Sequence, residues 1–270
     1  MSDLTLKLRE PPRQRVDLAA FTPDRLAEKT VEEIRRIPLW LGNHQVDTGD
    51  LFRVDGGDTD SILIQADSDR LDGIGTGMTR GQILVEGRAG AYLGREMRGG
   101  VVRVAGDAGM FAGVAMAGGI LRIDGDCGDF LGAAIPGERV SMRGGLIAVR
   151  GNAGDRVGDR LRRGTILVAG DAGDCCASRM GAGTIAVLGT TGTQAGLAMR
   201  RGTLLLAVEP ILPPTFNDNG VHHMGFLTLF AHSLTALEEP FSRLQERGTR
   251  VQRWLGDLGY AGKGEVLIWS

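Results

Sequence analysis

The sequence predicts an all-β core organised as a right-handed parallel β-helix, a solenoid of about seven 19-residue coils with short helical N- and C-terminal flanks. Three observations predict it: an internal period of 19 residues, glycine at four nearly fixed places in each period, and a short aliphatic strand between the first two glycines. Because a unit of 19 residues is too short to bury its own apolar face, stacked units must share one interior.

The repeat becomes visible when the chain is compared with itself. From Met78 onward, equivalent positions recur at spacings of 19, 19, 26, 19, 19 and 19 residues, at Met97, Met116, Met142, Leu161, Met180 and Met199. The one long spacing contains seven additional residues, 135–141, which we expect to form a loop. Residues 61–77 form a degenerate first coil. The regular stack is therefore expected to run from about Met78 to Ala207.

Glycine accounts for 43 of the 270 residues, whereas an average protein contains about 7% glycine. Most of the excess stands three, nine, twelve or sixteen residues after a coil start. In the coil that begins at Met97, these places hold Gly100, Gly106, Gly109 and Gly113. At corners, a positive φ or a close approach of the neighbouring coil excludes a Cβ atom; Ala177 is the one replacement at the fourth place. So many glycines exclude a helical repeat, and 19 is not a multiple of the six residues of a left-handed hexapeptide β-helix.

A short strand lies between the first two glycines of each coil. The places five and seven residues after the start are aliphatic throughout, and the place between them is mixed. This alternation predicts one buried face. The inward columns are Ile83, Val102, Leu121, Ile147, Ile166, Ile185 and Leu204, and Val85, Val104, Ile123, Val149, Val168, Val187 and Leu206. In the outward column Arg103 and Arg122 are neighbours, and we expect them on a solvated face or an interface.

Two further columns complete the coil. The methionine or leucine at each start is expected to fill an interior corner with flexible apolar volume. The residues directly after the second glycine favour turns, because short polar side chains bond to nearby backbone groups. These residues include Asp107, Asp126, Asn152 and Asp171.

The chain is expected to have three segments: an N-terminal helical leader, the glycine-repeat β-helix and a C-terminal extension, at residues 1–45, 46–208 and 209–270. In the leader, Thr22 followed by Pro23 predicts the start of a helix. Thr30 and Glu33 form a capping box for a second helix, which should end before Pro38. A strand at residues 51–54 is expected to begin the β-helix.

The C-terminal extension starts with a Pro-rich, extended stretch at residues 209–219. Helices are expected near residues 239–247 and 250–258, and a last strand at residues 265–269. Both flanks are expected to cap the open edges of the coils, which a solenoid needs in order to avoid edge-to-edge association.

The composition is that of an ordinary soluble protein, with 42% hydrophobic and 24% charged residues and a formal net charge of −2. This charge gives no reason to expect nucleic acid or an anionic membrane as a partner. No apolar run approaches the ~18 residues of a membrane span, and the first residues lack the apolar core of a signal peptide, which predicts a cytoplasmic protein. Cys127, Cys175 and Cys176 form no CxxC pair, so neither a disulfide framework nor a cysteine-ligated cluster is supported.

No residue stands out as catalytic, cofactor-binding or metal-ligating, and we expect none in this chain. His222 and His223 are adjacent, so they point apart on a strand, and no third ligand has metal spacing. Surface or interface histidines are therefore expected. His44 and His232 are isolated and are expected to be structural.

Other candidate motifs also favour structural roles. Cys175 and Cys176 lack a histidine base within the repeats, and we expect one of the two to point inward. Residues 73–77 resemble a phosphate-binding loop, but a strand follows them instead of the helix that such a loop requires. Residues 56–60 resemble a calcium-binding nonapeptide of which stacked copies are missing. Carbohydrate-cleaving β-helices place acidic residues beside basic ones, and the column of Arg103 holds no carboxylate pair.

The glycine coils resemble the domain at the C-terminal end of the glutamate synthase large subunit. Further segments resemble the C subunit of formylmethanofuran dehydrogenase and of the bacterial formyltransferase/hydrolase complex, so that the resemblance covers nearly the whole chain. These segments are the leader 18–37 with Phe21-Thr22-Pro23 and Thr30-Val31-Glu32-Glu33, then Gly49-Asp50-Leu51-Phe52, and Leu212-Pro213-Pro214-Thr215-Phe216.

The resemblance implies a role in one-carbon metabolism. In the bacterial complex, a formyl group passes from a tetrahydromethanopterin carrier to a methanofuran-type carrier and is hydrolysed to formate. The resemblance implies an amidohydrolase-like subunit with zinc, a formyltransferase subunit and a further dehydrogenase-like subunit as partners, with this chain as a non-catalytic scaffold. No cofactor is implied for this chain itself.

Three alternatives remain open. The chain resembles the C subunit of a molybdenum or tungsten formylmethanofuran dehydrogenase equally in its coils, but only three of its 31 basic residues are lysine, a composition typical of GC-rich bacterial genomes that favours the bacterial hydrolase version. A glutamate synthase-like amidotransferase module would normally belong to a far longer chain. A free-standing carbohydrate-active β-helix would be secreted, which the first residues contradict.

The inward and outward assignment makes a prediction. Val104→Asp should prevent soluble expression, because it places a charge in the shared apolar interior, whereas Arg103→Ala should fold. Soluble yield and the thermal unfolding midpoint measure both. Equal tolerance of the two substitutions would contradict the assignment.

Overall fold

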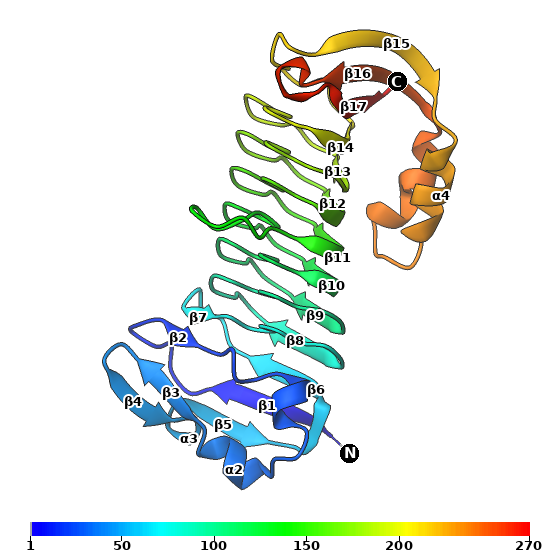
Figure 1. Ribbon diagram of the computed structural model, residues 1–270. Coiled ribbons are helices and arrows are strands. Elements are labelled where there is room, and N and C mark those ends of the chain that lie inside the picture. The colour runs from blue at the N-terminus through cyan, green and yellow to red at the C-terminus, as the bar shows by residue number, and fades with distance from the viewer. Residues whose placement is uncertain (1) are drawn as a thin grey trace.

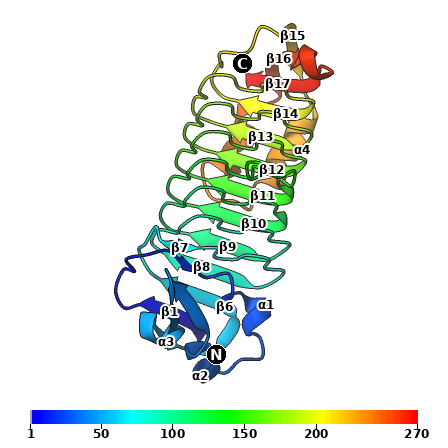
Figure 2. The same cartoon turned by 60° about the vertical axis from the view of Figure 1, so that its left-hand side comes forward.

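A computed structural model describes residues 2–270, and its core is all-β, as predicted. A large sheet of 13 strands has the order β15-β16-β17-β14-β13-β12-β11-β10-β9-β8-β6-β1-β5, and a small sheet has the order β4-β3-β2-β7 (Figure 1). The chain rises through a stack of coils, from the N-terminal elements at one end to the C-terminal strands at the other (Figure 2).

The coils contribute one strand each to the large sheet. These strands are β6 (Asp58–Gln65), β8 (Gln82–Glu86), β9 (Val101–Val104), β10 (Ala117–Ile123), β11 (Arg143–Val149), β12 (Arg163–Val168), β13 (Thr184–Val187) and β14 (Arg201–Leu206). All neighbouring pairs among them are parallel. Ile83 lies opposite Val102, and Val102 opposite Leu121, which confirms the predicted register. Both aliphatic columns are at most 1% exposed. The degenerate coil is confirmed as well, since Ile62 pairs with Ile83.

A second column joins the coils on another side. Single parallel bridges connect Ala89, Ala108, Cys127, Ala153, Ala172 and Thr191 in succession. Their small side chains are mostly buried. Because parallel strands lie about 4.8 Å apart, each coil is in backbone contact with the next on two sides.

The corner glycines serve two different purposes. Gly100 and Gly113 have positive φ values of 77° and 70°, which residues with a Cβ rarely adopt. Gly106 needs no positive φ, but a Cβ there would lie 2.8 Å from the carbonyl oxygen of Gly87 in the preceding coil. A positive φ therefore requires glycine at the first and last corners of the coil. At the second and third corners, the close approach of the preceding coil requires it.

The polar column after the second glycine links coils instead of closing turns within them. The backbone N–H of Asp126 donates to Asp107 Oδ1 (2.8 Å), that of Asn152 to Asp126 (2.7 Å), and that of Asp171 to Asn152 (2.9 Å). Asp171 accepts from the N–H and the hydroxyl of Thr190. The expected side chain–backbone bonds are present, but each one reaches the next coil.

The N-terminal segment contains more strand than predicted. Both helices are confirmed: α1 (Pro23–Leu26) starts after Thr22, and α2 (Val31–Arg35) has the capping box. The further elements are β1 (Asp3–Leu8), β2 (Val16–Asp17), β3 (Pro38–Leu41), β4 (His44–Asp47), α3 (Thr48–Leu51), β5 (Phe52–Asp55) and β7 (Leu71–Asp72). The strand expected at residues 51–54 exists as β5, but it does not begin the coils. It pairs antiparallel with β1, which lies between it and β6.

The C-terminal segment returns to the large sheet. Its elements are β15 (Asn217–His223), α4 (Phe226–Ser233), the 3₁₀-helix η1 (Phe241–Arg247), β16 (Arg250–Gly256), the 3₁₀-helix η2 (Leu258–Tyr260) and β17 (Lys263–Trp269). The last strand is confirmed and pairs parallel with β14. The helix expected at residues 250–258 is wrong: β16 pairs with both β15 and β17, because the open edge of β17 offers backbone hydrogen bonds that override local propensity.

Gly106→Ala should destabilise the protein by about 1–3 kcal/mol, because the new methyl group meets backbone that cannot move without shifting a whole coil. Gly57→Ala is the matched control, since a Cβ there meets nothing within 4 Å. Denaturant unfolding measures both, and equal stability of the two variants would contradict the close-packed corner.

The bond between coils at Asp171 predicts an acid-dependent loss of stability. Hydrogen bonds from the N–H and then the hydroxyl of Thr190 lower the pKa of Asp171. The fold therefore favours the carboxylate, so this stabilisation is complete above the unfolded-state pKa of about 3.9 and is lost as the pH falls through the lower folded-state pKa. Between about pH 5 and pH 2, the melting temperature should fall more steeply for the wild type than for Asp171→Asn, which does not titrate. Parallel curves would contradict this role.

Candidate interaction surface

The outer face of the large sheet is divided into two halves. In the upper coils, the outward column becomes apolar and buried at Ala148, Leu167, Ala186 and Leu205. The segment 226–247, here called the clasp, covers them with side chains that include Leu227, Phe241 and Leu244. Figure 1 shows α4 beside these coils. The prediction that the strands have one buried face is therefore wrong for this half, where both faces are buried.

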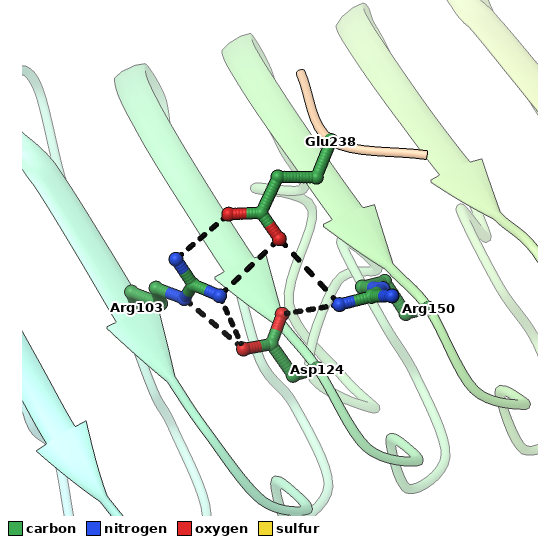
Figure 3. A network of polar contacts seen from close by, with 4 residues as sticks. All are labelled: Arg103, Asp124, Arg150 and Glu238. Atoms are coloured by element: carbon green, nitrogen blue, oxygen red, sulfur yellow. Dashed lines mark hydrogen bonds and ion pairs between the residues drawn. The ribbon is translucent and has the colours of Figure 1, made fainter. Parts of the chain in front are cut away.

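Between α4 and η1, Glu238 of the clasp joins a network of four charged side chains (Figure 3). Arg103 donates to Asp124 Oδ2 from Nε (3.0 Å) and Nη2 (2.9 Å), and to Glu238 Oε1 from Nη1 (2.8 Å). Arg150 Nη1 lies 3.5 Å from Glu238 Oε2 and 3.9 Å from Asp124 Oδ1. The hydrogen bond to Asp124 raises the pKa of Arg103. Two guanidinium groups thus face two carboxylates, and charge is balanced.

The apolar contacts and the charged network contribute different amounts of free energy to the binding of the clasp on the sheet. Burying one leucine such as Leu167 contributes roughly 1.5–3 kcal/mol, whereas a partly exposed ion pair contributes about 0–1 kcal/mol. The apolar face therefore holds the clasp on the sheet. The network fixes the position of Glu238 on the sheet, because its carboxylate pairs with arginines from two different coils, Arg103 on β9 and Arg150 after β11.

The lower half of the outer face stays open. A groove of about 490 Å³ lies over β6, β8 and β9, lined among others by Leu63, Leu84, Arg103 and Arg122. Leu84 is 37% exposed. Arg122 forms no ion pair with any residue of the described range 2–270, and its Nε is buried without a hydrogen-bond partner. Exposed apolar atoms beside an arginine without an ion-pair partner are typical of a surface that a partner covers.

The structure places the histidines and cysteines that the sequence analysis considered as ligands or nucleophiles in different parts of the molecule. His222 and His223 lie on β15, where His222 Nε2 is 2.9 Å from the carbonyl oxygen of Asn219. Cys176 points inward, as expected for one of the pair, and Cys175 lies 3.4 Å from Gln194 Oε1. Within residues 2–270, no group of three or more His, Cys, Asp and Glu side chains has the geometry to hold a metal ion.

The buried thiols are poor nucleophiles. Burial raises the pKa of both Cys127 and Cys176 to about 12, so the thiolate that would react is scarcely populated near neutral pH. Gly73 lies in a turn that is hydrogen-bonded to the next coil, because the N–H of Gly77 in this turn donates to the carbonyl oxygen of Arg95. As expected, a strand, β8, follows this corner instead of a helix.

Sequence reasoning missed Asp124 and Glu238. Asp124 stands two places beyond Arg122 on the same strand end, outside the outward column that holds the two arginines. The change of that column from Arg122 to Ala148 was the signal in the sequence that something covers the upper coils.

No helix among residues 2–270 is both long and apolar enough to cross a membrane.

No family model matches the sequence. The individual proteins that are similar to it agree with one another. The C subunit of the tungsten-containing formylmethanofuran dehydrogenase 2 of Methanothermobacter thermautotrophicus is 37% identical over 99 residues, which are 35% of this chain and 37% of the relative. The C subunit of the formyltransferase/hydrolase complex Fhc of Methylorubrum extorquens is 40% identical over 89 residues, 33% of this chain and 34% of the relative. The matched segments span about a third of these curated relatives.

A solved structure matches almost the whole chain. It is the crystal structure of the formyltransferase/hydrolase complex FhcABCD from Methylorubrum extorquens in complex with methylofuran. One of its chains is 39% identical and superposes with a TM-score of 0.90, covering 98% of this chain and 99% of that chain. The likeness therefore includes the flanks as well as the glycine coils.

The charged network predicts how the clasp opens. Glu238→Gln removes the charge that both arginines share, so we expect faster proteolysis and faster hydrogen exchange in the clasp with little change in the melting temperature. Glu239→Gln is the control, because Glu239 pairs only with Arg243 among residues 2–270. Equal cleavage rates in the two variants would show that the network does not hold the clasp.

Proposed function

This chain belongs to the family of the C subunits of formylmethanofuran dehydrogenases and of the formyltransferase/hydrolase complex, and on this premise we propose that it is a non-catalytic structural subunit of a formyltransferase/hydrolase complex. The full-length match to a chain of that complex carries the proposal. The open groove over β6, β8 and β9 supports a role in assembly.

In the proposed complex, a formyl group moves from formyl-tetrahydromethanopterin to a methanofuran-type carrier and is then hydrolysed to formate. The partners would be an amidohydrolase-like subunit that holds zinc, a formyltransferase subunit and a further dehydrogenase-like subunit. The related complex contains methylofuran, which agrees with a carrier of this type. The present chain would hold neither carrier nor metal.

We further propose that the coils wind as a right-handed parallel β-helix over residues 46–208, with residues 1–45 and 209–270 as separate flanks. The continuous parallel pairing from β6 to β14 supports this arrangement. An experimental density map would give the hand of the coils directly.

The second candidate is the C subunit of a molybdenum or tungsten formylmethanofuran dehydrogenase. The tungsten enzyme's C subunit supports it with 37% identity over 99 residues. A glutamate synthase-like amidotransferase module is a third candidate, supported only by the glycine repeat. The match over the whole chain favours the hydrolase complex.

Affinity purification from the native host tests the proposal. The tagged chain should bring an amidohydrolase, a formyltransferase and a dehydrogenase-like protein in fixed ratio, and the assembly should release formate from formyl-tetrahydromethanopterin when the carrier is added. The chain purified alone should be inactive. Recovery with molybdenum or tungsten and iron–sulfur subunits would favour the second candidate, and recovery as a lone monomer would contradict a scaffold role.

A further inference from the structure

A strongly cationic groove lies away from the outer face of the sheet. Five arginines line it, Arg139, Arg160, Arg162, Arg179 and Arg200, together with Gly181, Ala198 and Tyr260, and its volume is about 460 Å³. No acidic residue is among the lining residues. We refer to it as the arginine groove. The chain as a whole carries a formal net charge of −2, so this concentration of positive charge is local.

Three separate parts of the sequence build the arginine groove. Arg139 belongs to the seven-residue insertion in the one long coil, and Tyr260 belongs to η2 of the C-terminal extension. Arg162 and Arg200 both follow a coil start by one residue, two coils apart. In Figure 1 the insertion projects from the coils on the side away from α4. An insertion, the repeat and an extension thus converge on one site.

Part of the arginine groove is fixed in place by buried polar contacts. Arg179 donates to Asp159 from Nε (2.8 Å) and Nη2 (2.6 Å), and Asp159 is only 2% exposed. Ser178 Oγ also donates to Asp159 (2.7 Å). Arg160 donates to the carbonyl oxygen of Glu138 in the insertion (3.1 Å), which holds the loop against the coils.

The other arginines lack anionic partners. Among residues 2–270, Arg139, Arg162 and Arg200 form no ion pair. All three are exposed. Clustered guanidinium groups repel one another and gain most from an anion that accepts bidentate hydrogen bonds. The arginine groove is therefore complementary to several negative groups at once.

The shape of the arginine groove restricts the ligand. Gly181 and Ala198 stand between the arginines and leave room for a main chain. Coils spaced by about 4.8 Å place the backbones of Arg162 and Arg200 roughly 10 Å apart, so their guanidinium groups can match negative groups that follow one another along an extended chain. Single-stranded nucleic acid normally needs several aromatic platforms for its bases, and Tyr260 is the one aromatic lining residue.

We propose that the arginine groove binds an extended, carboxylate-rich segment of a partner subunit and so anchors that subunit to the coil stack. This inference rests on the proposed function, because another subunit supplies the acidic segment. It assigns one partner contact to the insertion side of the molecule, apart from the open groove over β6, β8 and β9.

Binding of a fluorescent peptide of eight glutamates to the isolated full chain tests the chemistry. At low salt the peptide should bind, and Arg162→Glu with Arg200→Glu should weaken binding at least about tenfold. Arg13→Glu with Arg250→Glu makes the same change in net charge at exposed sites elsewhere and should leave binding within about twofold. No binding, equal loss in both double variants, or tighter binding of a DNA oligonucleotide or of tripolyphosphate would overturn the proposal.

Cross-linking in the native complex tests the partner. A photoreactive benzoylphenylalanine at position 260, in the place of half-exposed Tyr260, should cross-link to an Asp- and Glu-rich segment of one partner subunit. Arg162→Glu with Arg200→Glu should abolish that cross-link. With the partners present, cross-linking to a neutral or basic segment, or none, would refute the arginine groove as their contact. Absence of the partners from the wild-type preparation would instead contradict the proposed function, and the inference with it.

Discussion

The structure depends on one constraint: successive coils must lie at the distance of a parallel β-ladder on two sides at once. The strand column and the bridge column that runs through Ala108 and Ala153 both impose it. At that spacing a Cβ at Gly106 would meet the backbone of the preceding coil. The corner glycines, the common spacing of 19 residues and the aliphatic interior are consequences of this one distance, because a bulkier corner would break hydrogen bonds to the neighbouring coils. The seven additional residues of the one long coil leave the ladder intact on both sides, because they form a separate loop.

The same constraint decides what the surface can do. A rigid stack repeats each outward position at a fixed interval, so substitutions in one column create continuous stripes. Where the outward column is apolar, from Ala148 to Leu205, the clasp covers it. Where it carries Arg103 and Arg122, it stays charged and partly open. A third stripe, which holds Arg162 and Arg200, carries the arginine groove.

These stripes suit a protein that positions others. The interior is filled with buried aliphatic side chains from both columns of the strands. The outer surfaces have distinct character: a covered apolar half, an open half with an unsatisfied arginine, and a cationic groove built partly from an insertion. Distinct surfaces on a stiff support allow different partners to be held at fixed separation.

The sequence by itself determined the coil length, the register of Ile83, Val102 and Leu121, the inward columns and the two N-terminal helices, because each depends on local pattern and on a period that stacking must respect. Only the tertiary structure decided that β1 and β16 enter the large sheet, that the clasp buries Leu167, and that Glu238 meets Arg103 across 135 residues of chain. These contacts join segments far apart in sequence, where no short-range periodicity records which surfaces will meet.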